Sequence, residues 1–289
     1  MKKSSLKVAL LTAALSLVAC FAYANEKCKE CHTDIVTKHS SSLHGKAGKS
    51  CDVCHGGVDA HLASNNKKDI ITYSAKGDTK KLDAECLGCH AKNQNLMFWD
   101  NSKHKTGDVA CVSCHSIHKA AKPLAQQPDK CFECHKDVKS QANKFSHHPI
   151  IEGKVKCSDC HNPHGTLSKN MITAETINQL CYKCHGDKRG PFVWEHPPVA
   201  EDCAICHSPH GSKTSKLLVD KPPRLCANCH TNAHSVNSPL DNSLSFTGTP
   251  SGYVNNNTKR RAIDRGCSNC HVAIHGSNGQ GQQGKYFAR

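Results

Sequence analysis

The pentapeptide CxxCH occurs ten times in this 289-residue chain and limits its possible folds more than any other feature. The ten copies use twenty of the twenty-one cysteines, and each ends in a histidine directly after its second cysteine. Two thiols separated by two residues can each form a thioether with a haem vinyl group, and the adjoining histidine can then bind the iron. The pattern predicts ten covalently attached haems of the c type.

The predicted attachment sites follow directly from the motifs. The thioether cysteines are Cys28, Cys31, Cys51, Cys54, Cys86, Cys89, Cys111, Cys114, Cys131, Cys134, Cys157, Cys160, Cys181, Cys184, Cys203, Cys206, Cys226, Cys229, Cys267 and Cys270. The proximal iron ligands are His32, His55, His90, His115, His135, His161, His185, His207, His230 and His271.

A unit of about fifty residues repeats four times, which indicates a modular architecture. Each repeat holds one CxxCH, then a lead-in histidine, then a second CxxCH followed by a trailing histidine. The repeats cover residues 28–61, 86–118, 131–164 and 181–210, and two closing sites follow at 226–234 and 267–275. The lead-in histidines are His44, His104, His148 and His196, the trailing ones are His61, His118, His164 and His210, and the closing ones are His234 and His275.

Counting histidines predicts the second iron ligand. The chain has 22 histidines, and the repeat nominates ten of the twelve that are not proximal, so every haem can have a distal histidine. His39 and one of His147 and His148 are left over, and we assign His148 because it precedes Pro149 as His196 precedes Pro197. Three methionines are too few for general methionine ligation.

The position of the trailing histidines predicts how the repeats connect. A side chain three residues after a proximal ligand lies on the wrong face to bind the same iron. We therefore expect His118, His164 and His210 to serve a neighbouring haem and to link consecutive repeats.

Composition indicates an interior built on the cofactor. Aromatic residues make up 5% of the chain and the mean hydropathy is -0.56, so apolar porphyrin faces must supply much of the buried surface. The predicted fold class is a multihaem cytochrome c, elongated, with short α-helices and irregular coil wrapped around ten covalent haems and little or no β-sheet. Helices are expected over 84–91 with Asp83 as cap, over 130–139 next to Asp129, and over 174–185 after Thr173.

The N-terminus has the pattern of a signal peptide. A basic start, an apolar run from Val8 to Ala19 and a small-residue site at Ala24 predict a leader over residues 1–24 and a mature haem domain over 25–289. Cys20 has two interpretations, an ordinary leader residue lost on cleavage or the lipidated cysteine of a lipobox. The predicted leader and the thiols committed to haem indicate export from the cytoplasm.

The formal charge of +14 does not indicate nucleic-acid binding. Lys2, Lys3 and Lys7 belong to the leader, and ten ferric haems with ionised propionates would reduce the remaining charge to about +1. A zinc protein is disfavoured because each histidine directly abuts the second cysteine instead of standing at a distance. A dithiol oxidoreductase would need one reactive pair on a βαβ frame.

Four stretches resemble the MtrA/DmsE family of periplasmic decahaem c-type cytochromes. They are CSDCHNPHG (157–165), WEHPPVAEDCAICHSPHGS (194–212), PPRLCANCH (222–230) and CSNCHVAIHGSN (267–278), and the likeness extends over essentially the whole mature chain. The resemblance implies bis-histidine haems inside an outer-membrane β-barrel porin. It also implies donors among inner-membrane or periplasmic cytochromes, and an extracellular multihaem cytochrome or terminal reductase as the other partner.

The expected function is therefore electron transfer between periplasm and cell exterior, in extracellular respiration or metal- or DMSO-type reduction. An iron bound by two histidines has no vacant position for a substrate, so the protein is not expected to be an enzyme. Two alternatives stay open: a freely diffusing periplasmic shuttle that feeds a soluble reductase, and a multihaem reductase with one open iron.

Overall fold

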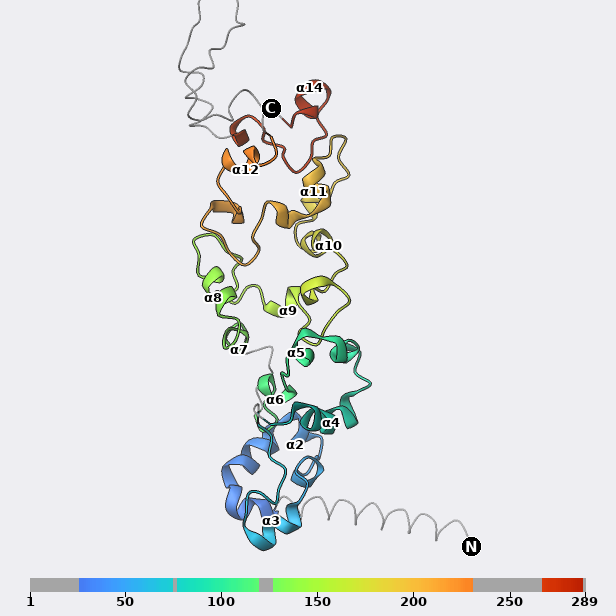
Figure 1. Cartoon of the computed structure of the whole chain (residues 1–289), viewed down its shortest axis with the longest axis vertical. Helices are drawn as coiled ribbons and strands as arrows, with labels where there is room; N and C mark the ends of the chain where they lie inside the picture. Colours follow the sequence, from blue (N-terminus) through green and yellow to red (C-terminus); the bar gives the residue numbers. More distant parts are fainter. Residues whose placement is uncertain (1–25, 75–76, 120–126, 231–266, 288–289) are drawn as a thin grey trace, which may run out of the picture. The chain divides into compact units, whose positions relative to one another are not determined.

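The computed structural model describes residues 26–74, 77–119, 127–230 and 267–287 (Figure 1). The predicted leader, Cys20, and the predicted ligand His234 lie outside these residues. The described parts consist of short helices and coil, with isolated β-bridges such as Ser146 with Ser212 in place of strands. The prediction of helix and coil with little or no sheet is confirmed. No helix within the described ranges combines the length and apolarity needed to cross a bilayer.

The chain divides into two compact units. Unit 1 takes the described residues up to Lys130 together with Asn162–Leu167, and unit 2 takes Cys131–His161 and the described residues from Ser168 onward. The end of the third predicted repeat, which contains His164, therefore belongs to unit 1.

The helices are short throughout (Figure 1). In unit 1, residues 26–41 are helical, followed by α2 (Leu43–Lys46), η1 (Cys51–Val53), α3 (Val58–Ser64), α4 (Thr79–His90), η2 (Gln94–Leu96), η3 (Trp99–Asn101), α5 (Lys103–Thr106) and α6 (Cys111–Cys114). Helix α7 (Asp129–Phe132) lies where the units divide. Unit 2 holds α8 (Lys136–Ala142), α9 (Cys157–Cys160), η5 (Lys169–Met171), α10 (Ile177–Tyr182), η6 (Gly186–Lys188), α11 (Pro197–Glu201), η7 (Cys203–Ile205), η8 (Ser215–Leu217), α12 (Arg224–Ala227), η10 (Cys267–Asn269) and α14 (Gly281–Lys285).

The three helices predicted from sequence have different boundaries in the structure. Helix α4 begins at Thr79 because Asp78, not Asp83, accepts the free N–H groups of its first turn. The segment 130–139 is interrupted between α7 and α8. Helix α10 begins after Thr176, whose side chain accepts the backbone N–H of Gln179 at 3.1 Å.

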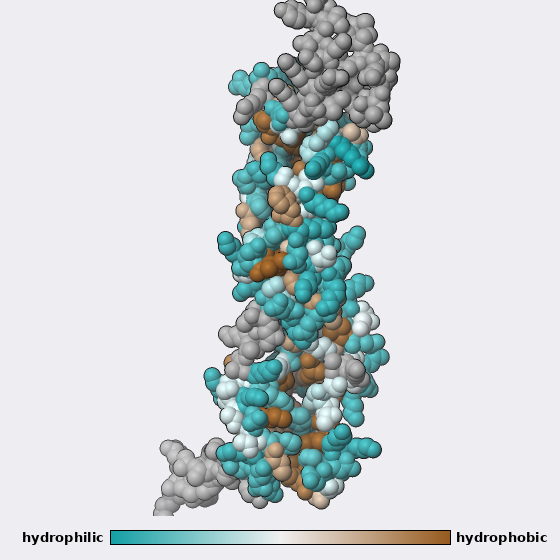
Figure 2. All heavy atoms as spheres, turned by 90° about the vertical axis from the view of Figure 1, so that its left-hand side faces the viewer, coloured by the Kyte–Doolittle hydropathy of each residue, from teal (hydrophilic) through white to brown (hydrophobic). Residues whose placement is uncertain are grey.

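The polypeptide has a small core of its own. Among the described residues the buried hydrophobic ones are Leu82, Trp99, Ala110, Phe132, Ala142, Ile150 and Ile172. Only Phe132, Ala142 and Ile150 form a cluster, which Val138 and Val155 extend. On the face shown in Figure 2, hydrophobic residues form separate patches between hydrophilic ones. So little buried apolar surface is consistent with an interior completed by haem.

Candidate functional site

The CxxCH motifs fold as helical turns, which places the two thiols and the histidine close together. In eight motifs the histidine N–H donates to the carbonyl of the first cysteine at 2.9–3.0 Å, and the motifs at Cys28 and Cys86 lie inside longer helices. Residues at i, i+3 and i+4 share one face of a helix. None of the described cysteines is in a disulfide, so both thiols of each motif can form thioethers.

The first cysteines of neighbouring motifs lie side by side. Hydrogen bonds join the thiols in five pairs: Cys28 with Cys51, Cys86 with Cys111, Cys131 with Cys157, Cys181 with Cys203, and Cys226 with Cys267. The bond from Cys111 lowers the pKa of the Cys86 thiol to about 7, and the bond from Cys86 raises the pKa of Cys111. The two attachment sites of one repeat are therefore adjacent.

The second cysteines provide the next link. Burial is the largest cause that raises the pKa of the Cys54 thiol, and the charges of Cys86 and Cys89 raise it further. In the same way, the charge of Cys184 raises the pKa of Cys160, and that of Cys229 raises the pKa of Cys206. Each of these pairs joins the second motif of one repeat to the first motif of the next. Within each unit, attachment sites that follow one another in the sequence are thus also neighbours in space.

Eight pairs of facing histidine rings each combine one motif histidine with one predicted distal histidine. The pairs in unit 1, with ring-centroid distances, are His32 with His61 (6.4 Å), His44 with His90 (5.9 Å), His55 with His118 (5.9 Å) and His115 with His164 (5.9 Å). The pairs in unit 2 are His148 with His185 (6.2 Å), His161 with His210 (6.0 Å), His196 with His230 (6.2 Å) and His207 with His275 (6.1 Å).

This spacing fits a metal ion between the two rings. An ion bonded to both imidazoles at roughly the 2.0–2.1 Å typical of metal–imidazole bonds would hold the ring centroids about 6 Å apart. Direct stacking of two rings would bring them closer. The residues present therefore fit haem iron with histidine on both sides.

The pairs follow one rule, except that His61 faces His32 in the first motif of its own repeat. Lead-in histidines face the first motif of the next repeat, as His44 faces His90 and His148 faces His185. Trailing histidines face the second motif of the preceding repeat, as His118 faces His55. These contacts support the predicted link between repeats, and the ligand assignment itself stays a prediction.

Backbone carbonyls also orient two further predicted ligands. His104 and His271 each direct Nδ1 to a backbone carbonyl, that of Pro163 at 2.8 Å and that of Tyr286 at 2.6 Å. The partners of these two rings and of His135 stay predictions.

Backbone carbonyls orient the ligand rings. Nδ1 lies 2.7–3.0 Å from a carbonyl oxygen in His55, His61, His148, His161 and His207. An Nδ1–H donated to a carbonyl leaves Nε2 as the nitrogen available to a metal, the usual arrangement for ligand histidines.

Burial also keeps several of these rings in the form that binds metal. Burial, as the largest cause, lowers the pKa values of His44, His115, His118, His164, His196, His210 and His275. A lowered pKa favours the neutral imidazole at neutral pH, and the neutral ring is the one that coordinates metals.

The structure separates His147 from His148. His147 lies with Nδ1 2.6 Å from the carbonyl of Lys144 and Nε2 3.0 Å from a carboxylate oxygen of Glu152, so both nitrogens are engaged. The hydrogen bond to Glu152 raises the pKa of His147. His148 instead directs Nδ1 to the carbonyl of Pro209 at 2.7 Å and faces His185.

Replacing His148 should leave one haem with a single protein ligand. We expect His148→Ala to convert one haem per chain from low spin to high spin, because the ring opposite His185 is removed. His147→Gln is the matched control and should remain fully low spin. Electron paramagnetic resonance of the ferric protein measures the difference, and a high-spin signal in His147→Gln alone would reverse the assignment.

Sequence reasoning missed two residues that hold the paired motifs together. Asp83 is 1% exposed, accepts the backbone N–H of Cys111 at 2.9 Å and lies 3.1 Å from Lys105 Nζ. In unit 2, Asn178 accepts the N–H of Cys203 at 2.7 Å. Both stand three residues before the first cysteine of a repeat. That shared position is the sequence signal that could have identified them.

Two family models match parts of the chain. One, described as "Doubled CXXCH motif", matches residues 147–190 and 196–235. The other, described as "Cytochrome c-type protein NrfB-like", matches residues 51–129.

Known proteins with similar sequences are named as cytochromes. The chain is 38% identical over 244 residues to "Multiheme cytochrome MtrA" of Shewanella baltica, covering 82% of this chain and 71% of that protein. It is 28% identical over 129 residues to "Cytochrome c-type protein NrfB" of Escherichia coli, covering 40% and 68%. It is also 25% identical over 239 residues to "C-type polyheme cytochrome OmcB" of Geobacter sulfurreducens, covering 68% of this chain and 31% of that protein.

Proposed function

The chain belongs to the multihaem c-type cytochrome family that includes MtrA, an electron-transfer family with covalently attached haem, and on this basis we propose a periplasmic electron carrier with ten bis-histidine haems. The protein carries electrons across the outer membrane from inside a β-barrel porin. Its donors are inner-membrane or periplasmic cytochromes, and its other partner is an extracellular multihaem cytochrome or terminal reductase.

The eight facing histidine pairs carry the proposal. When bound, haem would supply one-electron redox chemistry. At the described pairs, such as His55 and His118 with ring centroids 5.9 Å apart, the chain's own imidazoles would hold the iron from both sides and leave no vacant position for a substrate. Residues that close both sides of a metal favour electron transfer over catalysis. We therefore propose that the protein is not an enzyme.

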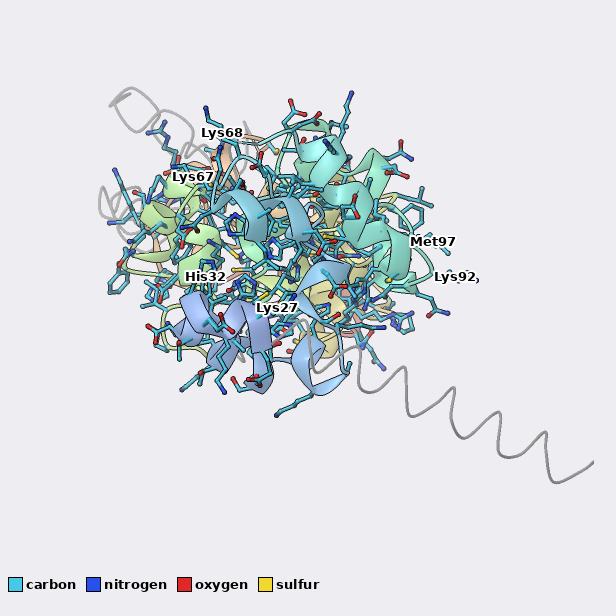
Figure 3. The ribbon with its side chains drawn as sticks, turned by 90° about the horizontal axis from the view of Figure 1, so that it is seen from below. Lys27, His32, Lys67, Lys68, Lys92 and Met97 are labelled. Carbon is cyan, nitrogen blue, oxygen red and sulfur yellow. The ribbon has the colours of Figure 1, made fainter. Side chains whose placement is uncertain are left out.

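The order of the attachment sites supports conduction along the chain. A hydrogen bond joins the thiols of Cys86 and Cys111 within a repeat, and the thiols of Cys54 and Cys89, in neighbouring repeats, interact electrostatically. His32 is exposed in unit 1, as are Lys27, Lys67 and Lys68 (Figure 3).

Ten haems and complete histidine ligation are tested on the purified native protein. We expect ten thioether-linked haems per polypeptide by mass spectrometry and a pyridine haemochrome assay, with a low-spin ferric spectrum. Far fewer haems would contradict the carrier. A substantial high-spin fraction with turnover of nitrite or another oxyanion would favour a multihaem reductase.

Insertion in a porin is tested separately. We expect the protein to co-purify with an outer-membrane β-barrel, and the pair to reduce an external acceptor from a donor enclosed in liposomes. Liposomes that contain the barrel alone are the control. A wholly soluble pool, with no conduction in the reconstituted pair, would favour the freely diffusing shuttle.

A further inference from the structure

His39 and Trp99 occupy the same place in the first and second repeats. Each stands five residues before a lead-in histidine, His44 or His104. Each carbonyl accepts a backbone N–H from the serine three residues later, at 2.8 Å from Ser42 and 2.9 Å from Ser102. The two serines then cap α2 and α5, the helices that carry the lead-in histidines. The repeat thus holds two chemically different rings in equivalent backbone positions.

Both rings are buried against a trailing histidine. His39 is 8% exposed and its ring lies 6.2 Å from that of His118, at an angle of 70° between the planes. Trp99 is 6% exposed and lies 6.0 Å from the ring of His164, at 69°. Edge-to-face contacts of this kind are favourable between aromatic rings.

The Trp99 Nε1–H is buried without a hydrogen-bond partner among the described residues, so the contact of this ring with His164 depends on packing. Buried N–H groups normally have such a partner. An indole held in place without one is positioned by its ring contacts, chiefly with His164.

The angles between facing ligand rings vary with these neighbours. The planes of His118 and His164 lie 14° and 16° from those of His55 and His115. In the third repeat Asn143 stands five residues before His148, and the corresponding trailing ring, His210, lies 31° from His161.

The end of the chain fits the same trend. The ring of His196 lies 5.4 Å from that of Phe287. The plane of His196 lies 18° from that of His230. Near-parallel planes therefore accompany an aromatic neighbour in each of these cases.

We propose that His39 and Trp99 are positioning residues that fix the rotation of the His118 and His164 imidazoles about their bonds to iron. They hold each distal ring nearly parallel to the proximal one at the second haem of the first two repeats. This inference rests on the proposed function, because it requires that His118 and His164 are iron ligands.

Electron paramagnetic resonance of the ferric holoprotein tests the role of Trp99. Parallel imidazole planes give rhombic low-spin spectra, whereas strongly twisted planes give a broad low-field feature. We expect Trp99→Ala to lose the rhombic signal of one haem, because the His164 ring is released. Trp99→Phe should retain the rhombic signal because the ring edge is kept. Trp99→His introduces the residue type found at position 39 and should retain the signal as well.

Trp194→Phe is the matched control. This substitution removes the other indole of the chain, whose Nε1 donates to the carbonyl of Gly279 at 3.0 Å. It should leave the rhombic signals unchanged. If Trp99→Ala does not accumulate, the same test is made at the equivalent position, where His39→Ala should lose one rhombic signal and His39→Phe should retain it.

The outcomes separate the inference from the proposed function. A fully loaded, low-spin Trp99→Ala protein with an unchanged spectrum overturns the positioning role and leaves the carrier intact. A wild-type protein with few low-spin haems overturns the proposed function instead. Loss of the rhombic signal in Trp99→Phe as well as Trp99→Ala would overturn packing of the ring edge as the cause.

Discussion

The polypeptide should not fold when haem attachment is blocked. The described residues bury only seven hydrophobic side chains, and one small cluster around Phe132 is all that they form. A chain with so little apolar burial cannot offset the conformational entropy that ordering costs, about 1–2 kcal/mol per residue. The faces of covalently held haem are the apolar surface that the fold lacks.

Expression in a strain without cytochrome c maturation tests this prediction. We expect a far-UV circular dichroism spectrum dominated by coil, and digestion by trypsin at least a hundredfold faster than for the holoprotein. The double variant Cys267→Ala with Cys270→Ala is the control, because it removes one attachment site near the chain end and should keep the other haems. A haem-free chain with native helix content and protease resistance would show that the polypeptide has a sufficient core.

Replacing Asp83 should cause the largest loss of stability among single substitutions away from the ligands. Its carboxylate is 1% exposed, accepts the N–H of Cys111 and pairs with Lys105 Nζ at 3.1 Å. Removing one partner of a buried ion pair costs about 3–5 kcal/mol, and Lys105 keeps 18% of its side chain exposed, which places the cost near the lower end. We expect Asp83→Ala to lose about 3 kcal/mol of unfolding free energy.

The second unit provides the comparison. Asn178 makes the equivalent bond to Cys203 N–H with a neutral side chain, and its Nδ2 donates to the carbonyls of Val199 and Ala200. Asp83→Asn should therefore lose less than Asp83→Ala, since the amide can keep the bond to Cys111. Guanidinium unfolding followed by Soret circular dichroism measures both, with the exposed Asp59→Ala as control. Equal guanidinium unfolding midpoints for Asp83→Ala and Asp59→Ala would show that the buried carboxylate contributes nothing to stability.

Much of the local chemistry can be read from the sequence because it depends on residues close together in the chain. The ten CxxCH motifs require only one helical turn each to bring two thiols and an imidazole to one face. The trailing histidines could be excluded from their own haem by the same local geometry, and the structure places His118 and His164 opposite motif histidines of the preceding repeat. Low hydropathy likewise predicted a polypeptide with little core of its own.

Helix boundaries were less predictable. Asp83 has the residue type and position of a helix cap, yet it lies inside α4, where it binds Cys111 N–H and Lys105. A sequence pattern records that a carboxylate is present and cannot show which distant N–H group it meets. Helix α10 begins after Thr176 because this residue, and not Thr173, caps its first turn.

By itself, the sequence determined what could be predicted of the chemistry: which thiols would attach haem, which histidines could bind iron, and a chain built from repeats. Only the tertiary structure decided which imidazole faces which, that His148 and not His147 faces His185, and that His39 and Trp99 lie against ligand rings. The physical reason is distance along the chain. A helical turn is specified by neighbouring residues, whereas a facing pair such as His161 and His210 forms only when segments 49 residues apart pack together.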